Sequence, residues 1–122
     1  MYIEGDLYSY PQTIACFGGG DRSYLPTRGG IILGGRFKPK MNPRAPDVVV
    51  VGNNPQVVEK ANALGKGGYA IPVFVWERSN KWRYKGMYKC IEHSKDAVVI
   101  SSNDAGRPDI DSILFLEYVP AS

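Results

Sequence analysis

The stretch that decides the fold is IPVFVWERSNKWRYKGMYK, residues 71–89. The polar pair Ser79-Asn80 separates an apolar run from a second run with aromatic residues at 82, 84 and 88 and basic residues at 83, 85 and 89. This period of two predicts a strand with one buried and one solvent-facing side. We therefore expect a hairpin with strands at 70–78 and 81–91, joined by a tight turn.

Other short apolar runs, bounded by glycine, proline or polar residues, predict further strands on both sides of this hairpin. Residues 1–11 look irregular, and residues 36–46 hold three prolines and four cations, so we expect an exposed loop there. The further strands are expected at Thr13–Phe17, Gly30–Gly35, Asp47–Gly52, Ala97–Ser101 and Ser112–Val119.

One segment carries the signals of a helix. Asn54 is a favourable N-cap residue, and Pro55 suits the first helical position. The apolar residues that follow fall on one helical face, and glycines then end the segment. The apolar face consists of Val57, Val58, Ala61 and Leu64, and the glycines are Gly65, Gly67 and Gly68.

These elements, with 14 Gly and 9 Pro residues in the chain, predict an α+β fold that is mostly β. We expect a small curved mixed sheet closed into a partial barrel, with one helix packed on it. Neither a linker nor a repeat divides the sequence, so residues 1–122 are interpreted as a single domain.

Composition narrows the class of protein. With 43% hydrophobic and 22% charged residues the chain is expected to fold, and no apolar run is long enough to span a bilayer. The first ten residues, MYIEGDLYSY, have no basic segment leading into an apolar run. We therefore expect an intracellular protein, cytoplasmic or nuclear, without a membrane partner.

Catalysis and metal binding find little support in the sequence. Cys16 and Cys90 are expected to be reduced thiols rather than one disulfide, because no secretory signal is present. With His93 they form no set of ligands at zinc-site spacing, and no acid at motif spacing orients that histidine. We expect no metal, no cofactor and no enzymatic activity.

The net charge of +3 conceals an uneven distribution. Residues 22–46 contain six of the 15 Lys and Arg residues and no acid, and a second basic group lies on the strand at 81–91. Two basic groups in a small domain favour a phosphate-backbone partner over a merely solvated loop. The cations of the first group are Arg22, Arg28, Arg36, Lys38, Lys40 and Arg44.

Four further residues are candidates for contact with a base. Phe37 is either a wedge inserted into nucleic acid or an anchor of the loop onto the barrel, and Trp76 is either core edge or stacking platform. Asp47 either caps a turn or accepts a hydrogen bond from an exocyclic amine. Tyr24, near Arg28, is expected to approach the same surface if both loops lie at one end of the barrel.

The order of motifs from residue 30 onward resembles the SRA/YDG family of PUA-like β-barrels. The tail GRPDIDSILFLEYV is compatible with the closing strand of such a domain, and PKMNPRAPD stands where that family has an aspartate-rich segment. The three motifs are GGIILGGRF at 29–37, VVGNNPQVVEKANAL at 50–64 followed by IPVFVWE at 71–77, and WRYKGMYKC at 82–90.

The resemblance implies a non-catalytic reader of modified bases in DNA, which takes a flipped base into a barrel pocket. It favours double-stranded DNA, with RNA as an alternative, and a nuclease or other effector domain as a fused or associated partner. Because the aspartate-rich segment is missing, the modification could lie on cytosine, on another base or on the backbone. The alternative function is a protein-interaction or regulatory β-domain, with solubilising cations and core aromatics.

Overall fold

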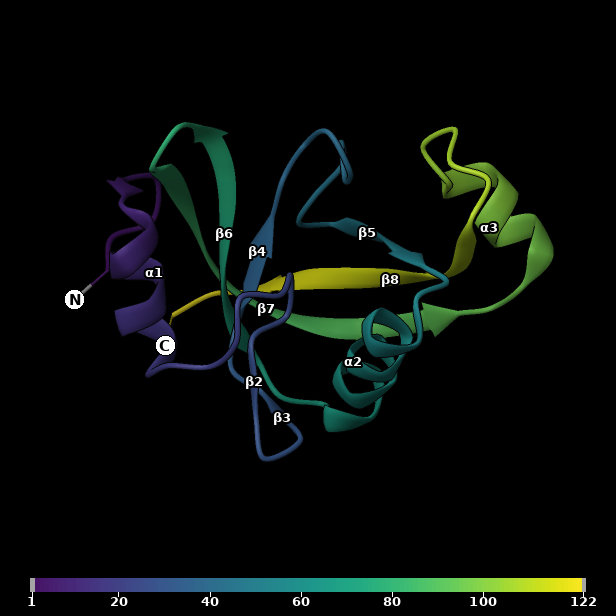
Figure 1. Ribbon diagram of the computed structural model, residues 1–122, viewed down its shortest axis with the longest axis horizontal. Helices are drawn as coiled ribbons and strands as arrows, with labels where there is room; N and C mark the ends of the chain where they lie inside the picture. Colours follow the sequence, from purple (N-terminus) through teal and green to yellow (C-terminus); the bar gives the residue numbers. More distant parts are fainter. Residues whose placement is uncertain (1, 122) are drawn as a thin grey trace.

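Eight strands and three helices make up the computed structural model, which describes residues 2–121. Figure 1 shows α1 and α3 at opposite ends of the long axis, with α2 packed below the sheet. In chain order the elements are β1 (Leu7–Tyr8), α1 (Tyr10–Phe17), β2 (Thr27–Arg28), β3 (Ile31–Ile32), β4 (Gly35–Phe37), β5 (Val48–Gly52), α2 (Pro55–Gly67), β6 (Ile71–Arg78), β7 (Lys81–Ser94), α3 (Ala97–Asn103) and β8 (Ile110–Val119).

A curled sheet in the order β4-β6-β7-β8-β5 forms a half-barrel, and β1 adds to the edge of β7. The β4–β6 pair is parallel and the other pairs are antiparallel, so the sheet is mixed as the sequence predicts. The hairpin at residues 71–94 with its turn at Ser79-Asn80 is confirmed, and so is the strand Val48–Gly52. Strands β2 and β3 form a separate pair.

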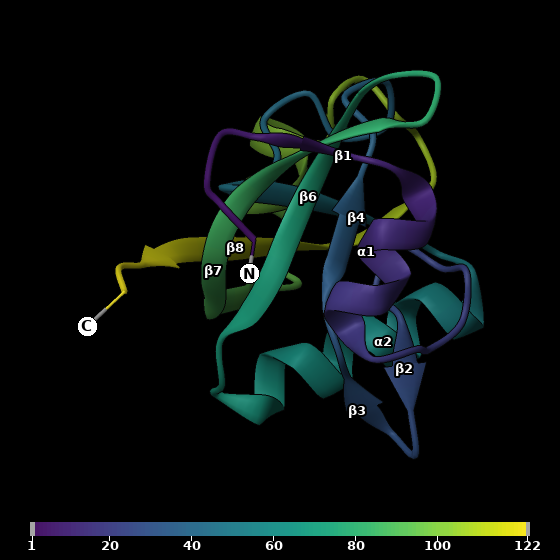
Figure 2. The ribbon, with the colours of Figure 1, turned by 90° about the vertical axis from the view of Figure 1, so that its left-hand side faces the viewer.

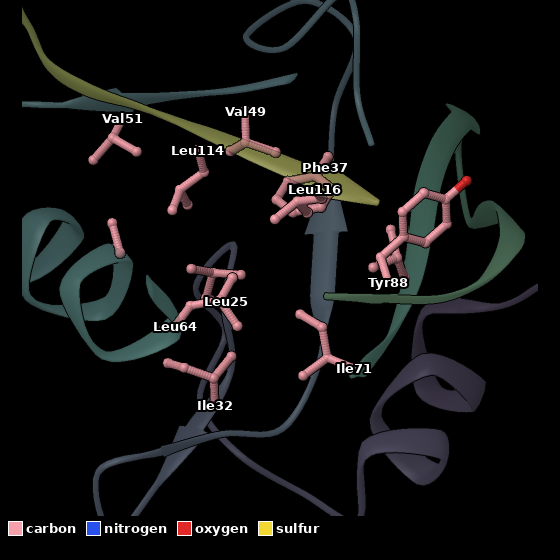
Figure 3. Close-up of a cluster of buried hydrophobic side chains, with 12 residues drawn as sticks. Leu25, Ile32, Phe37, Val49, Val51, Leu64, Ile71, Tyr88, Leu114 and Leu116 are labelled. Carbon is pink, nitrogen blue, oxygen red and sulfur yellow. The ribbon is translucent and has the colours of Figure 1, made fainter. Parts of the chain in front are cut away.

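Helix α2 fills the inner face of the half-barrel (Figure 3). The predicted N-cap is confirmed, because the Asn54 side chain accepts a hydrogen bond from the Gln56 amide, and Gly68 ends the helix in a left-handed conformation. The side chains around Leu64 are buried and come from six strands, from α2 and from the segment before β2. They include Leu25, Ile32, Phe37, Val49, Val51, Ala61, Ile71, Val73, Tyr88, Leu114 and Leu116.

The expectation of a single helix is wrong, because α1 and α3 also form and pack on the outer face of the sheet. Thr13–Phe17 was expected to be a strand, but Ser9 and Gln12 form a capping box that starts a helix at Tyr10. Asp96 caps α3 over the segment expected as the strand Ala97–Ser101. Short apolar runs fit either element, and the caps decide between them.

The strands before β5 also differ from those expected from the sequence. Residues 1–11 contain the short strand β1, and the single strand expected over Gly30–Gly35 is replaced by β3 and β4. The loop expected at 36–46 begins two residues later, because Arg36 and Phe37 belong to β4 and are buried. Phe37 is 1% exposed, so the anchor interpretation holds and the wedge interpretation is wrong.

The long strand β7 does not keep one buried face. Val73 pairs with Gly86 and Phe74 with Tyr84, so Lys85 is an extra residue in a β-bulge. Gly86 has a φ of 103°, which favours glycine there. The bulge reverses the sides of the strand: Trp82 and Tyr84 pack under α1, whereas Tyr88 joins the inner core beside α2.

Candidate functional site

An open cleft of about 690 Å³ lies between the start of α1, the end of β4 and the turn of the β6–β7 hairpin. Figure 2 shows α1 in front of β4 and beneath that turn. The lining combines aromatic, basic and amide side chains, and among residues 2–121 it includes no carboxylate. The lining residues are Tyr10, Arg22, Ser23, Tyr24, Arg36, Lys38, Met41, Asn42, Trp76, Ser79, Asn80 and Trp82.

Aromatic rings form one side of the cleft. Trp76 and Trp82 are cross-strand partners on β6 and β7, and the Tyr10 ring centroid is 6.2 Å from that of Trp82. Trp82 is 6% exposed and belongs to the core cluster beneath α1, whereas Trp76 is half-buried at its edge. Trp76 therefore offers the partly open ring on which a flat ligand can stack.

Arg36 lines the cleft but is a buried structural residue, 5% exposed. Its guanidinium donates to Thr13 Oγ1 at 3.2 Å and to the Asp21 carbonyl at 3.0 Å. Its Cζ lies 4.6 Å from the ring centroid of Tyr10 and 5.3 Å from that of Phe17, within cation–π range. Burial lowers the pKa of Arg36. Arg36 thus ties α1 and the following loop to β4.

Two cations at the rim of the cleft are available to a ligand. Arg22 and Lys38 are exposed, and within the described residues neither takes part in an ion pair or a side-chain hydrogen bond. Lys38 Nζ lies over the Trp76 ring, 5.8 Å from its centroid, so a positive charge and an aromatic ring lie together at the rim. Lys40 is exposed two residues further along, outside the lining. A planar anionic ligand would find stacking and charge together here.

Two asparagines line the cleft, one from the 38–47 loop and one from the hairpin turn. Asn42 Oδ1 accepts a hydrogen bond from the Val50 amide at 2.6 Å, which fixes the 38–47 loop against β5. Asn80 Oδ1 accepts one from the Tyr10 amide at 2.8 Å, which fixes the hairpin turn against α1. Asn80 has a φ of 55°, in the left-handed region that asparagine tolerates.

The structure brings five of the ten predicted contact residues together at this cleft: Arg22, Tyr24, Arg36, Lys38 and Trp76. Tyr24 is anchored there, because its hydroxyl donates to the Val57 carbonyl at 2.8 Å, and burial raises its pKa. Sequence reasoning missed Tyr10, Asn42, Asn80 and Trp82 as lining residues. The turn at Ser79-Asn80 was visible in the sequence, but its contact with the N-terminal helix was not.

The other five predicted residues lie elsewhere or only near the rim. Phe37 is in the inner core, and Lys40 stands outside the lining. Arg28 donates to the Gly18 carbonyl, and Arg44 Nη1 donates to Asn103 Oδ1 at 2.9 Å. Asp47 is exposed in a turn just before β5, and its carbonyl accepts from the Leu116 amide at 2.9 Å. Each position is explained by local packing.

The basic group on β7 is partly neutralised. Arg83 Nε and Nη2 each lie 2.7 Å from a carboxylate oxygen of Glu77, a bidentate ion pair across the hairpin. Hydrogen bonds from Arg83 lower the pKa of Glu77, and the same pairing raises the pKa of Arg83. The sequence predicts a uniformly cationic strand face, and this expectation is wrong, because Arg83 on that face is paired with Glu77.

The thiol and imidazole groups do not form a common site. Cys16 packs in the cluster beneath α1, whereas His93 Nε2 lies 2.8 Å from Ser112 Oγ near α2. Both cysteines are free. Among residues 2–121, no group of three or more His, Cys, Asp or Glu side chains could hold a metal ion. None of the described helices is long and apolar enough to cross a membrane.

The chain was compared with protein-family models, with curated protein sequences and with solved structures. None of the three comparisons found a match. The likeness to the SRA/YDG family is therefore carried by the order of the sequence motifs alone. The chemistry of the cleft carries the functional argument that follows.

Proposed function

We propose that this protein is a nucleic-acid-binding domain and that its cleft holds one base removed from its stack. The observation that carries the proposal is that the exposed cation of Lys38 lies over the half-buried Trp76 ring, in a cleft whose described lining holds no carboxylate. A base stacks on the tryptophan, and its phosphates lie along Arg22, Lys38 and Lys40 at the rim. The domain binds and positions the base and performs no chemistry on it.

The finer proposal is that the partner is duplex DNA with a modified base that flips into the cleft. Its support is the motif order that resembles SRA-like readers, together with a curled half-barrel sheet of the expected general kind. The cleft volume of about 690 Å³ lies within the range of small-molecule binding sites. A flipped base with a substituent is therefore a plausible occupant by size.

The first test separates the phosphate contacts from the stacking contact. We expect the double variant Arg22→Ala/Lys38→Ala to weaken binding of labelled DNA and to reduce the slope of log K against log salt by about 1.4 to 1.8. Fluorescence anisotropy at several salt concentrations measures both. The matched control is Lys66→Ala/Lys89→Ala, which removes two exposed cations away from the cleft and should change the slope little.

Trp76→Ala tests the stacking contact in the same assay. We expect a loss of about 1–3 kcal/mol in binding free energy with an unchanged salt slope, because stacking releases no counterions. Trp76→Phe retains an aromatic face and should recover part of the affinity. Equal effects of the cleft and control double variants, with no effect of Trp76→Ala, would show that the cleft is not the binding surface.

The second test asks for the modification. Duplexes containing 5-methylcytosine, 5-hydroxymethylcytosine, N6-methyladenine or a phosphorothioate linkage are compared with unmodified duplex and matched RNA. A preference that persists at higher salt supports a modification reader, because the nonspecific phosphate contribution weakens there. Equal binding to all duplexes would leave a general nucleic-acid binder. Absence of binding to every probe would favour the protein-interaction alternative.

A further inference from the structure

The hydrogen-bonding groups of the cleft carry a second inference, which rests on the proposed function. A backbone N–H can only donate, so the oxygen of an asparagine amide must face it, and the NH₂ group must point the other way. This rule determines the orientation of both asparagines in the cleft. Each of them turns its oxygen toward the backbone N–H that it accepts and its NH₂ donor group the other way.

For Asn42, the bond from the Val50 amide occupies Oδ1, and no protein partner bonds Nδ2 within the described residues. Asn42 is only 6% exposed, yet its Nδ2 is not among the buried polar atoms that lack a partner. The nitrogen therefore reaches solvent, and the residue lines the cleft. Its NH₂ group is a free donor at the cleft surface.

Asn80 repeats this arrangement at the hairpin turn. Its Oδ1 is occupied by the Tyr10 amide, and Nδ2 has no bonded partner within residues 2–121. The residue is exposed at the hairpin turn. Together with the cations of Arg22 and Lys38, the two amides give the cleft four donor groups without a protein acceptor.

The acceptors of the lining are largely occupied within the protein. The Tyr24 carbonyl accepts from the Arg36 amide at 2.9 Å, and the Lys38 carbonyl accepts from the Asn42 amide at 2.9 Å. The Ser23 and Tyr10 carbonyls accept from the Arg36 and Thr13 side chains. No Asp or Glu lines the cleft. Apart from the hydroxyls of Tyr10, Ser23 and Ser79, which can donate as well as accept, a ligand with its own donors meets few free acceptors.

We propose that the cleft selects bases that present keto oxygens, such as uracil, thymine or hypoxanthine, over bases that present an exocyclic amino group. A keto oxygen accepts from the asparagine NH₂ groups. An amino group at the same place sets donor against donor, so neither group gains a hydrogen bond from the contact. The discrimination comes from the exocyclic group, whereas stacking on Trp76 and the phosphate contacts are common to all bases.

The test uses short single strands with one central base and abasic sites elsewhere, so that only one base is offered to the cleft. The matched pairs are uracil against cytosine and hypoxanthine against adenine, in which a keto oxygen replaces an amino group on the same ring system. We expect the keto member of each pair to bind about five- to tenfold more tightly. Anisotropy at constant salt measures the two ratios.

Asn42→Asp and Asn80→Asp identify the donors. Each substitution keeps an oxygen facing the same backbone N–H and replaces the cleft-facing NH₂ by an acceptor oxygen. We expect the uracil-to-cytosine ratio to fall to about one or to reverse, although the added negative charge lowers both affinities. Asn62→Asp on α2 adds the same charge away from the cleft and should leave the ratio unchanged.

Circular dichroism checks that each variant is folded. If one of the two variants misfolds, the uracil-to-cytosine ratio of the other still tests the keto preference. Equal binding of keto and amino bases, or a ratio that Asn42→Asp and Asn80→Asp leave intact, would overturn the keto preference. Binding of all four strands through Trp76 would then still support the proposed function. If no strand bound at any salt concentration, both the preference and the proposed function would be wrong.

Discussion

The segment 22–46 and strand β7 are both rich in lysine and arginine, but the charged side chains of the two regions have different surroundings. On β7, Arg83 is paired with Glu77. In the segment 22–46, Arg36 is buried without a carboxylate partner among the described residues, and Arg28 and Arg44 bond to neighbouring oxygens. Lys38, two residues after Arg36, is exposed beside Trp76.

The number of cations in a sequence segment is therefore not the charge that the segment offers to a partner. A guanidinium can serve as an internal tie, as Arg36 does with α1, or as half of an ion pair, as Arg83 does. Only exposed cations without a hydrogen bond or an ion pair in the described residues, here Arg22, Lys38 and Lys40, can bind phosphate without first breaking one. The predictions below separate these uses by substitution.

The largest expected effect concerns Phe37, which lies between Arg36 and Lys38 in the chain. Phe37→Ala should lower the free energy of unfolding by about 3–5 kcal/mol, because the ring is buried in the inner core. Phe37→Leu keeps most of the volume and should cost less than about 1.5 kcal/mol. Urea denaturation measures both. A small effect of Phe37→Ala would mean that the ring is not part of the core.

Arg36→Ala should come next, at about 3 kcal/mol, since it leaves the Asp21 carbonyl and Thr13 hydroxyl without their donor. Lys38→Ala, the matched loss of a neighbouring cation, should stay within about 0.5 kcal/mol of the native protein. The same urea assay compares them. Similar costs for the two would contradict the distinction between a buried and a free cation.

Asp21 tests the ion pairs at acidic pH. Burial alone would raise its pKa, but hydrogen bonds from Lys60 and Ser23 outweigh burial and lower the pKa. Protonation therefore favours the unfolded chain, whose Asp pKa is about 3.9, and this contribution is lost as the pH falls through the lower folded pKa. Asp21→Asn should flatten the decline of stability below about pH 5, by less than about 1 kcal/mol because the carboxylate is half exposed.

The exposed Asp6 supplies the control for this titration, since Asp6→Asn changes the charge equally without removing an ion pair in the described residues. Thermal unfolding followed across pH 3 to 6 gives the profiles. Identical profiles for Asp21→Asn and the native protein would show that the Lys60 pair contributes nothing.

The smallest expected effect is a gain of binding. Glu77→Gln removes the charge that holds Arg83, so a β7 cation becomes available to phosphate. We expect nucleic-acid affinity to rise about two- to threefold at low salt and less at higher salt. The melting temperature should hardly change, because the pair is on the surface. Unchanged affinity at low salt would place β7 outside the reach of the nucleic acid.

Much of the fold could be predicted because its signals are local. The Asn54-Pro55 start of α2 needs only neighbouring residues to form, and the hairpin turn at Ser79-Asn80 is set by the residues that flank it. By contrast, a short apolar run such as Thr13–Phe17 suits a helix or a strand equally well. This run forms a helix because of the capping box at Ser9 and because its apolar side chains pack on the aromatic outer face of the sheet.

The candidate site was only half predictable, because its walls come from distant parts of the chain. Tyr10 and Asn80 are joined by a hydrogen bond across 70 positions, and Asn42 bonds to β5. Such contacts leave no local pattern in the sequence. Trp76 and Lys38 stood out as exposed aromatic and basic residues, but their proximity did not.

By itself the sequence determined a mostly β domain with a long hairpin, one capped helix and an excess of cations in the segment 22–46. These are properties of composition, periodicity and neighbouring residues. Only the tertiary structure decided which cations are buried, paired or free, and it alone gathered Tyr10, Asn42, Trp76 and Asn80 into one cleft. The physical reason is that burial and hydrogen-bond partners depend on what packs against a residue, which is set by chain segments far away in sequence.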